Sequence, residues 1–186
     1  MQYKEIRAVY DNHTIRVYQA YNSVIAKEAV QLGTFGKNFK LTRMTWIKPS
    51  FLWMMYRCGW GLKQNQEHVL AIDIKRQAFD EIVKNAVVSN YSAIENNLSY
   101  QEWQEQIKNS DIRVQWDPER DIQGNALDYR SIQIGLRGQA VKNYVQDWIV
   151  NIEDITEFVI NLRNKRQNGL DISELLPQEK IYFLEI

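Results

Sequence analysis

Residues that could bind an anion are concentrated in one segment, 43–61. It reads Arg-Met-Thr-Trp-Ile-Lys-Pro-Ser-Phe-Leu-Trp-Met-Met-Tyr-Arg-Cys-Gly-Trp-Gly, with three Trp, two Arg and one Lys in nineteen residues. Pro49 fits the first position of a helix over 50–58, and Gly59 fits its end. The free backbone N–H groups and the dipole at the start of a helix favour an anion. We therefore expect a phosphate cradle built from Arg43, Lys48 and Ser50.

The same segment offers aromatic side chains that could stack on a base. Trp46 and Trp60 are the candidates, and Arg57 would add a second guanidinium for phosphates. Trp60 lies between two glycines, so we expect it to face a ligand, whereas Trp53, mid-helix among apolar residues, is predicted to be core. The alternative is that all three tryptophans are core, that Ser50 only caps the helix and that Arg57 forms a structural ion pair.

A second candidate segment covers residues 129–138, Tyr-Arg-Ser-Ile-Gln-Ile-Gly-Leu-Arg-Gly. Arg137 follows a predicted strand and lies between Gly135 and Gly138, where the backbone permits close approach of a ligand. We expect Arg137 to reach the pocket of the first segment and to hold a phosphate with its guanidinium fork. Gln133, or an acidic residue in its place, is a catalytic candidate that would steer a nucleophile. The alternative is an ordinary turn into the next helix.

Several common chemistries are excluded by the residues present. No Gly-x-x-x-x-Gly-Lys-Ser/Thr or Gly-x-Gly-x-x-Gly motif occurs. His13 and His68 are the only histidines, and they lie far apart, so no metal site is expected. Cys58, the single cysteine, ends an apolar helix and is typical of a small buried hydrophobe. The charged run 117–121 reads as a solvated turn, with a cation site at its aspartates as the alternative.

Charge is distributed unevenly along a chain of 186 residues whose net charge is zero. Residues 1–63 hold ten Lys or Arg against three Asp or Glu, whereas residues 64–186 hold 13 against 20. A basic region rich in Trp and Tyr suits a nucleotide or single-stranded RNA. The alternative is that the two regions pack together and pair their charges.

Composition predicts one globular domain, 1–186, because 45% of residues are hydrophobic and 25% are charged. No apolar run approaches the roughly 20 residues of a membrane span. The N-terminal residues lack the apolar core of a signal peptide. We therefore expect a soluble, cytoplasmic protein that does not enter a membrane.

Hydrophobic periodicity and cap residues predict a mixture of strands and helices. The expected strands are 14–21, 68–74, 111–116, 132–136, 148–152 and 181–186, and the expected helices include 25–32, 50–58, 79–86, 139–146 and 155–166. Asn22 and Ser23 are the cap candidates before the helix 25–32, and Gly33 is expected to end it. Two capping boxes are expected, Ser99 with Glu102 and Asp154 with Glu157. Because the elements do not alternate strictly, the predicted class is α+β, with a mixed or antiparallel sheet and packed helices.

The run 43–57, the following Gly-Trp-Gly and the later run 133–138 together resemble the family called domain of unknown function 4291. The resemblance extends from Ile15 to about Lys165. It implies one intact domain and no particular reaction.

The opening of the chain is also similar, at the level of fold, to ADP-ribosyltransferase-like domains. The shared features are a strand over 16–21, a helix that ends at a glycine, and then a mixed set of strands. That resemblance implies a cleft for NAD, with Arg16 in the first strand position and Gln133 in the third, where the family has glutamate. The chain departs from the family because no His-Tyr-Glu or Arg-Ser-Glu triad can be placed.

The function expected from these features is a nucleotide- or nucleic-acid-directed protein, with an NAD-using, ADP-ribosyltransferase-like enzyme as the leading form. A binding module for RNA or a nucleotide, without catalysis, is the alternative. A third possibility is an interaction protein whose tryptophans are only core.

Overall fold

The computed structural model describes residues 3–93 and 98–184. Its first long strand, β3 (Thr14–Tyr21), pairs antiparallel along its whole length with β5 (His68–Lys75). β5 pairs in turn with β9 (Ile149–Asp154), which completes a three-stranded sheet. The β-branched and aromatic residues of β3 suit this pleated, half-buried surface.

A second, mixed sheet is built on a long hairpin. Its strands are β7 (Ile112–Arg120) and β8 (Ala126–Leu136), which pair antiparallel. β4 (Thr45–Ile47) pairs antiparallel with the end of β8. The short strands β1 (Tyr3–Lys4) and β6 (Val87–Val88) pair in parallel with β8 and β7.

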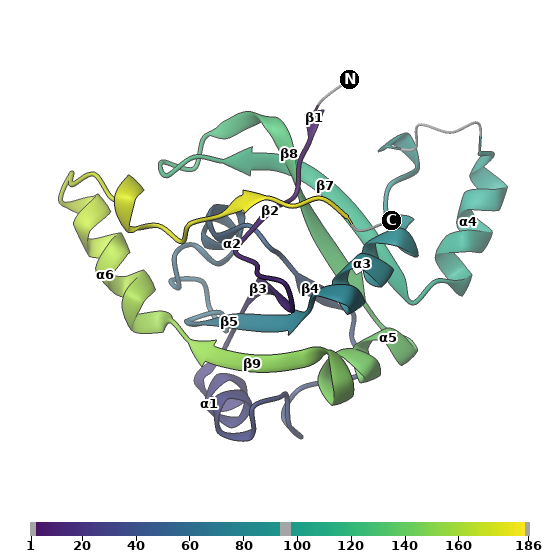
Figure 1. Ribbon diagram of the computed structural model, residues 1–186, viewed down its shortest axis with the longest axis horizontal. Coiled ribbons are helices and arrows are strands. Elements are labelled where there is room, and N and C mark those ends of the chain that lie inside the picture. Colours follow the sequence, from purple (N-terminus) through teal and green to yellow (C-terminus); the bar gives the residue numbers. More distant parts are fainter. Residues whose placement is uncertain (1–2, 94–97, 185–186) are drawn as a thin grey trace.

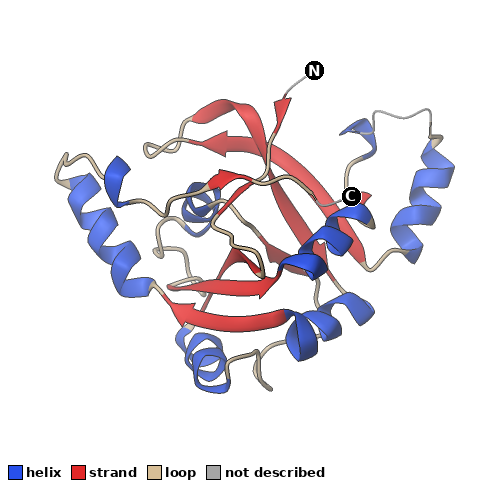
Figure 2. Ribbon diagram, viewed as in Figure 1, coloured by secondary structure: helices blue, strands red, loops and turns tan. Residues whose placement is uncertain are grey.

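The two sheets meet beside β4. Lys48 directly follows this strand, and its backbone carbonyl accepts a hydrogen bond of 2.7 Å from the N–H of Tyr18 in β3. The strands β9, β5, β3, β4, β8 and β7 therefore follow one curve and form a half-barrel (Figure 2). The described residues make a single α+β domain, which confirms the predicted fold class.

Helices cover the half-barrel and extend its ends, with α6 and α4 at opposite ends of the long axis (Figure 1). They are α1 (Ser23–Leu32), α2 (Phe51–Cys58), α3 (Arg76–Lys84), α4 (Tyr100–Asn109), α5 (Gly138–Asn143) and α6 (Thr156–Gln167). α5 continues into a π-helical turn, Tyr144–Trp148. Short pieces complete the chain: β2 (Arg7–Ala8), β10 (Lys180–Ile181) and the 3-10 turns Tyr91–Ala93 and Ser173–Leu175.

Two apolar clusters lie on the two faces of β3, because neighbouring residues of a strand point to opposite faces. Val17 belongs to the larger cluster, and Tyr18 belongs to the smaller one. The larger cluster includes Ile15, Ile72, Phe79, Ile132 and Ile134. The smaller one lies where α2 and α6 cover the sheet and includes Phe51, Met55, Val69 and Val159.

Local signals placed several element boundaries correctly. Asn22 caps α1 by accepting hydrogen bonds from two backbone N–H groups, and Gly33 ends that helix with φ 70°. The expected capping box of Ser99 and Glu102 is present at the start of α4. In each case the deciding interaction lies within a few residues along the chain.

Other boundaries differ from the prediction. β7 runs through Asp117 and Pro118 instead of turning there, because a register shift after Pro118 accommodates the missing N–H. α2 starts at Phe51, so Pro49 precedes the cap residue and is not the first helical residue. The capping box expected at Asp154 is not formed, because Ile155 and not Asp154 is the residue directly before α6. The Asp154 carboxylate accepts a hydrogen bond from the N–H of Thr156 instead.

The C-terminal strand is also shorter than predicted. Only Lys180–Ile181 is a strand, paired antiparallel with β2 near the start of the chain. Residues 185–186 of the expected strand lie outside the described residues.

Candidate functional site

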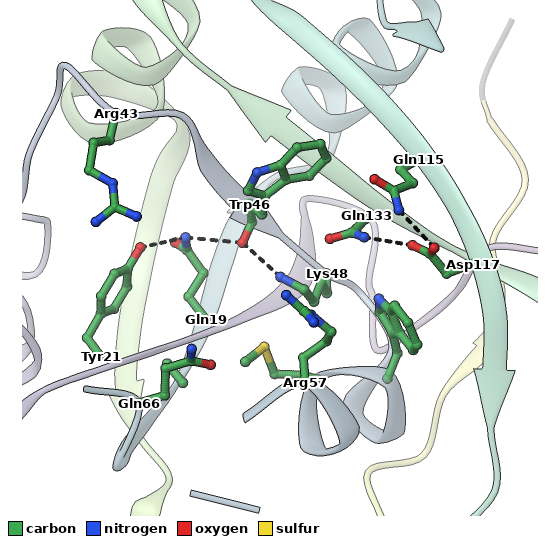
Figure 3. A pocket seen from close by; sticks show the side chains of 13 residues that line it. Gln19, Tyr21, Arg43, Trp46, Lys48, Arg57, Gln66, Gln115, Asp117 and Gln133 are labelled. Atoms are coloured by element: carbon green, nitrogen blue, oxygen red, sulfur yellow. Dashed lines mark hydrogen bonds between the residues drawn. The ribbon is translucent and has the colours of Figure 1, made fainter. Parts of the chain in front are cut away.

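A polar cavity of about 500 Å³ lies where β3, β4, β7, β8 and α2 meet (Figure 3). Its lining residues are Gln19, Ala20, Tyr21, Arg43, Trp46, Lys48, Trp53, Met54, Arg57, Gln66, Gln115, Asp117 and Gln133. Five candidate residues from two distant segments are among them: Arg43, Trp46, Lys48, Arg57 and Gln133. The half-barrel therefore brings the two segments together around one cavity.

Trp46 is placed in the cavity by its pairing with Gly135, which lies opposite it on β8. A Cβ on Gly135 would lie 3.1 Å from two carbons of the indole and 2.7 Å from Met44 Sδ. The indole thus packs directly over the backbone of β8, and glycine leaves the room for it. The packing of Trp46, and not the approach of a ligand, therefore accounts for the glycine at position 135.

Lys48 is a buried lysine in the cavity wall, only 6% exposed. Its Nζ donates a hydrogen bond of 3.3 Å to the backbone carbonyl of Trp46. Burial first, and the Arg57 guanidinium second, lower the pKa of Lys48 to about 7, against an opposing effect of Cys58 and Asp117. Near neutral pH the amine is therefore divided between its charged and its neutral form.

Gln19 organises a chain of polar groups beneath the cavity. Its Oε1 accepts a hydrogen bond of 2.8 Å from the buried Tyr144 hydroxyl. Its Nε2 lies 2.8 Å from the Tyr21 hydroxyl and 3.3 Å from the Trp46 carbonyl. That carbonyl also accepts the bond from Lys48, so the chain runs from Tyr21 to the amine (Figure 3). The network holds the backbone at Trp46 in place.

Asp117 is the one carboxylate among the described residues that line the cavity. Gln133 on β8 donates a hydrogen bond of 2.6 Å to it, and Gln115 on β7 donates one of 2.9 Å (Figure 3). Gln115 and Gln133 face each other in the hairpin, and Asp117 lies two residues further on the same face. The interpretation of Asp117 as part of a solvated turn was therefore wrong.

Arg43 and Arg57 are exposed residues that line the cavity from different elements, the loop before β4 and the last turn of α2. Neither guanidinium makes a hydrogen bond or an ion pair with any residue in the described ranges 3–93 and 98–184. The structural ion pair considered for Arg57 is thus absent from this part of the chain. Both cations remain available to an anion in the cavity.

Trp53 is buried, as predicted, with 5% of its surface exposed. It stacks on Tyr56, with 5.5 Å between the ring centroids, and it also lines the cavity. Its indole Nε1 is buried and has no hydrogen-bond partner among the described residues.

Ser50 does not belong to this cavity. Its hydroxyl accepts a hydrogen bond from Trp53 N, which makes it the cap of α2. The neighbouring N–H of Phe51 donates a hydrogen bond of 2.6 Å to the carboxylate of Glu179. The side chain of Glu179 therefore occupies this helix start, which corrects the prediction of a phosphate cradle around Ser50.

Arg16 and Trp60 are also placed elsewhere. Arg16 forms a bidentate pair with Asp73 on β5, at 2.8 and 3.0 Å, on the face of β3 opposite to Gln19. Trp60 is 7% exposed and packs in the smaller apolar cluster, with the Arg166 guanidinium 4.7 Å from its ring centroid. Neither residue lines the cavity, so the roles expected for them are corrected.

Arg137 lies at the end of α4 and away from the cavity lining. Its guanidinium donates hydrogen bonds to the carbonyls of Ile107, Lys108 and Ser110, which the helix leaves without partners. Gly138 has φ 54°, and a Cβ there would lie 2.3 Å from Asp111 Oδ1. Helix capping and the close approach of Asp111 explain both features without a ligand, and Arg137 is not among the residues that line the cavity.

A family described as a domain of unknown function (DUF4291) matches residues 5–182 of the chain. The chain belongs to the DUF4291 family. This confirms the resemblance carried by segments 43–57 and 133–138, and it places the whole cavity within the DUF4291 match. No curated protein matches the chain.

Two further findings describe this DUF4291 chain. Among residues 3–93 and 98–184, no helix combines the length and apolar character needed to cross a membrane. Within the same ranges, no three His, Cys, Asp or Glu side chains are grouped so that they could hold a metal ion.

Sequence reasoning missed several lining residues of the DUF4291 cavity. Gln19 and Tyr21 share the inward face of β3 with Val17, and a polar residue on such a face was the available signal. Gln115 and Asp117 became recognisable only when β7 was known to extend past Asp117.

Proposed function

We propose that this DUF4291 protein binds a phosphate-bearing ligand of the nucleotide class, or the end of a nucleic-acid strand, in the cavity around Trp46. One observation carries the proposal. Arg43 and Arg57, which have no partners among the described residues, line the same polar cavity as an accessible indole.

The charge of the cavity favours an anion. Arginine stays protonated and offers a planar fork of donors that fits phosphate oxygens. The single lining carboxylate, Asp117, already accepts hydrogen bonds from two glutamine side chains. The described lining therefore has more positive than negative side chains whether or not Lys48 carries a proton, since Arg43 and Arg57 face one carboxylate.

The remaining lining groups suit the base and sugar of a nucleotide. Trp46 offers a face for stacking, and Gln66 offers amide donors and acceptors. A volume of about 500 Å³ is within the usual range for small-ligand sites.

The first test is binding. Isothermal titration with ADP, NAD, ADP-ribose and a short single-stranded RNA should give saturable binding for at least one of them. Arg43→Gln and Arg57→Gln should each weaken that binding about tenfold, the effect of losing a charge-assisted hydrogen bond. Lys27→Gln removes a positive charge from the exposed face of α1 and should leave the affinity unchanged. Equal losses in all three variants would contradict a site at the cavity.

In its catalytic form, we propose that the protein is an NAD-using transferase. The Asp117 carboxylate, held in place by Gln133, would then take part in the reaction of the bound ligand. What supports it is a carboxylate fixed by short hydrogen bonds in the cavity that would hold the nucleotide. Consumption of NAD that is abolished in Asp117→Asn distinguishes this form from a binding module, which would bind NAD and return it unchanged. A cytoplasmic location, where nucleotides are abundant, is part of the same proposal.

A further inference from the structure

The amine of Lys48 is enclosed in the cavity wall and forms no ion pair with a carboxylate of the described residues. In the described ranges its Nζ has one hydrogen-bond partner, the Trp46 carbonyl at 3.3 Å, and no ion pair. The backbone of Lys48 directly follows β4 and forms a bridge with Tyr18 in β3, so the position of its Cα is fixed. A lysine buried for packing alone would bury its stem and leave the charged end in water.

Burial and a neighbouring cation favour the neutral form of this amine. The cation is the Arg57 guanidinium, and Arg43 lines the same cavity. Cys58 and Asp117 act in the opposite direction but do not overcome burial. Burial and a neighbouring cation are the two conditions that make a lysine nucleophilic near pH 7.

We propose that Lys48 is a nucleophile that forms an imine with the aldehyde or ketone of a phosphate-bearing ligand, such as the ring-opened terminal ribose of ADP-ribose, whose anomeric carbon carries no base. Recognition of the phosphate rests on the proposed function, whereas the reactivity of the amine does not. Arg43 and Arg57 would hold the phosphate while the carbonyl carbon reaches Nζ.

The reaction needs no oxidant or reductant. The lone pair of the neutral Nζ attacks the carbonyl carbon, and the carbonyl π electrons move to its oxygen, which takes up a proton. The resulting carbinolamine loses that oxygen as water. Both protons of the amine end on the water, and a C=N bond joins the ligand to Lys48.

Attack of the same amine on a nucleoside triphosphate, with loss of pyrophosphate, is the competing reaction. Such displacements commonly use a divalent cation held by carboxylates. The lining offers one carboxylate, and both of its oxygens already accept amide hydrogen bonds. Imine formation does not require carboxylates that hold a divalent cation, so the lining residues favour it over nucleotidyl transfer.

The test uses the folded full chain and traps the imine by reduction. Formaldehyde with cyanoborohydride probes the amine without any phosphate recognition, and peptide mass spectrometry locates the label. At pH 7 we expect Lys48 to be methylated at least about tenfold faster than each of the other eleven lysines. Its rate should titrate near pH 7, and Arg57→Gln should move that midpoint upward while Lys27→Gln leaves it in place.

Periodate-oxidised ADP, a nucleotide dialdehyde, then probes the ligand class. It should label Lys48 faster than oxidised adenosine does, and unmodified ADP should protect. Lys48→Met should abolish this label, with circular dichroism to verify folding.

A formaldehyde rate at Lys48 no higher than at the other lysines overturns the proposal, even if ADP binds. A fast formaldehyde reaction with no preference for oxidised ADP supports the nucleophile but overturns the proposed function. A nucleotide adduct on Lys48 that forms with ATP and without reductant overturns the imine in favour of nucleotidyl transfer.

Discussion

Among single residues, Lys48 is a cavity side chain whose burial lowers the free energy of unfolding. An amine with a pKa of about 7 in the folded chain and about 10.5 in the unfolded chain binds fewer protons when folded. Between these two values the unfolded chain holds the extra proton, so stability rises with pH. Below pH 7 both states are protonated, and the full penalty of a buried charge remains.

Replacing the amine by an apolar group should therefore stabilise the fold. We expect Lys48→Met to raise the free energy of unfolding at pH 6 by roughly 1–4 kcal/mol, because it removes a buried charge. The gain should shrink as pH rises from 7 to about 10. Urea denaturation across this range, with Lys27→Met on exposed α1 as the control, measures the difference. A gain that does not change with pH would mean that Lys48 is not the titrating group.

Gly135 allows a second prediction for a single residue. Gly135→Ala should displace the Trp46 indole and cost about 1–3 kcal/mol, because its Cβ would enter space that the ring and Met44 occupy. Ligand binding should weaken along with it. The double variant Gly135→Ala with Trp46→Ala tests the cause, since removal of the ring should abolish most of the added cost. Additive costs would show that the two residues are not coupled.

At the scale of elements, α2 supplies cavity residues from one side and is anchored from the other. Its last turn carries Arg57, and its first N–H, at Phe51, donates to Glu179. Burial raises the pKa of Glu179 to about 8; the Phe51 N–H lowers it, Glu119 adds to the increase and Arg7 opposes it. The folded chain thus holds a proton on Glu179 that the unfolded chain releases near pH 4.5.

Because the folded state binds the extra proton between pH 4.5 and 8, the contribution of Glu179 to stability falls as pH rises through that window. Glu179→Gln keeps an oxygen for the Phe51 N–H and cannot ionise. We expect the variant to match the wild type below pH 4.5 and to melt a few degrees higher at pH 8 to 9. Calorimetry at both ends of the range measures this. A lower melting temperature at pH 8 would show that the ionised carboxylate is required at the helix start.

The elements were predictable where the signal was local. The β-branched alternation of β3 and the caps of α1 and α4 are decided within a few residues, and these were correct. Phe51 and Arg137 lie next to helix ends, and their hydrogen-bond partners come from distant parts of the chain. No pattern of neighbouring residues indicates that Glu179 is the hydrogen-bond partner at the start of α2, since 128 residues separate it from Phe51.

At the scale of the whole molecule, the half-barrel decides which candidate residues meet. Segments 43–57 and 133–138 were recognised from composition, but their meeting depends on the pairing of β4 with β8. The same pairing directs Trp46 and Lys48 into the cavity, and hairpin register adds Gln115 and Asp117. The mixed α+β class could be predicted from periodicity. Membership of the cavity could not, because register over long separations is a property of the folded sheet.

The pairing of β10 with β2, together with the bond from Phe51 to Glu179, has a consequence for synthesis on the ribosome. A chain emerges from its N-terminus, so β2 and α2 exist long before their partners do. Until residue 179 has emerged, the first N–H of α2 lacks the carboxylate, and one edge of the nascent domain remains open. We therefore expect the wall of the cavity that carries Arg57 to become rigid late, although its own residues are translated early.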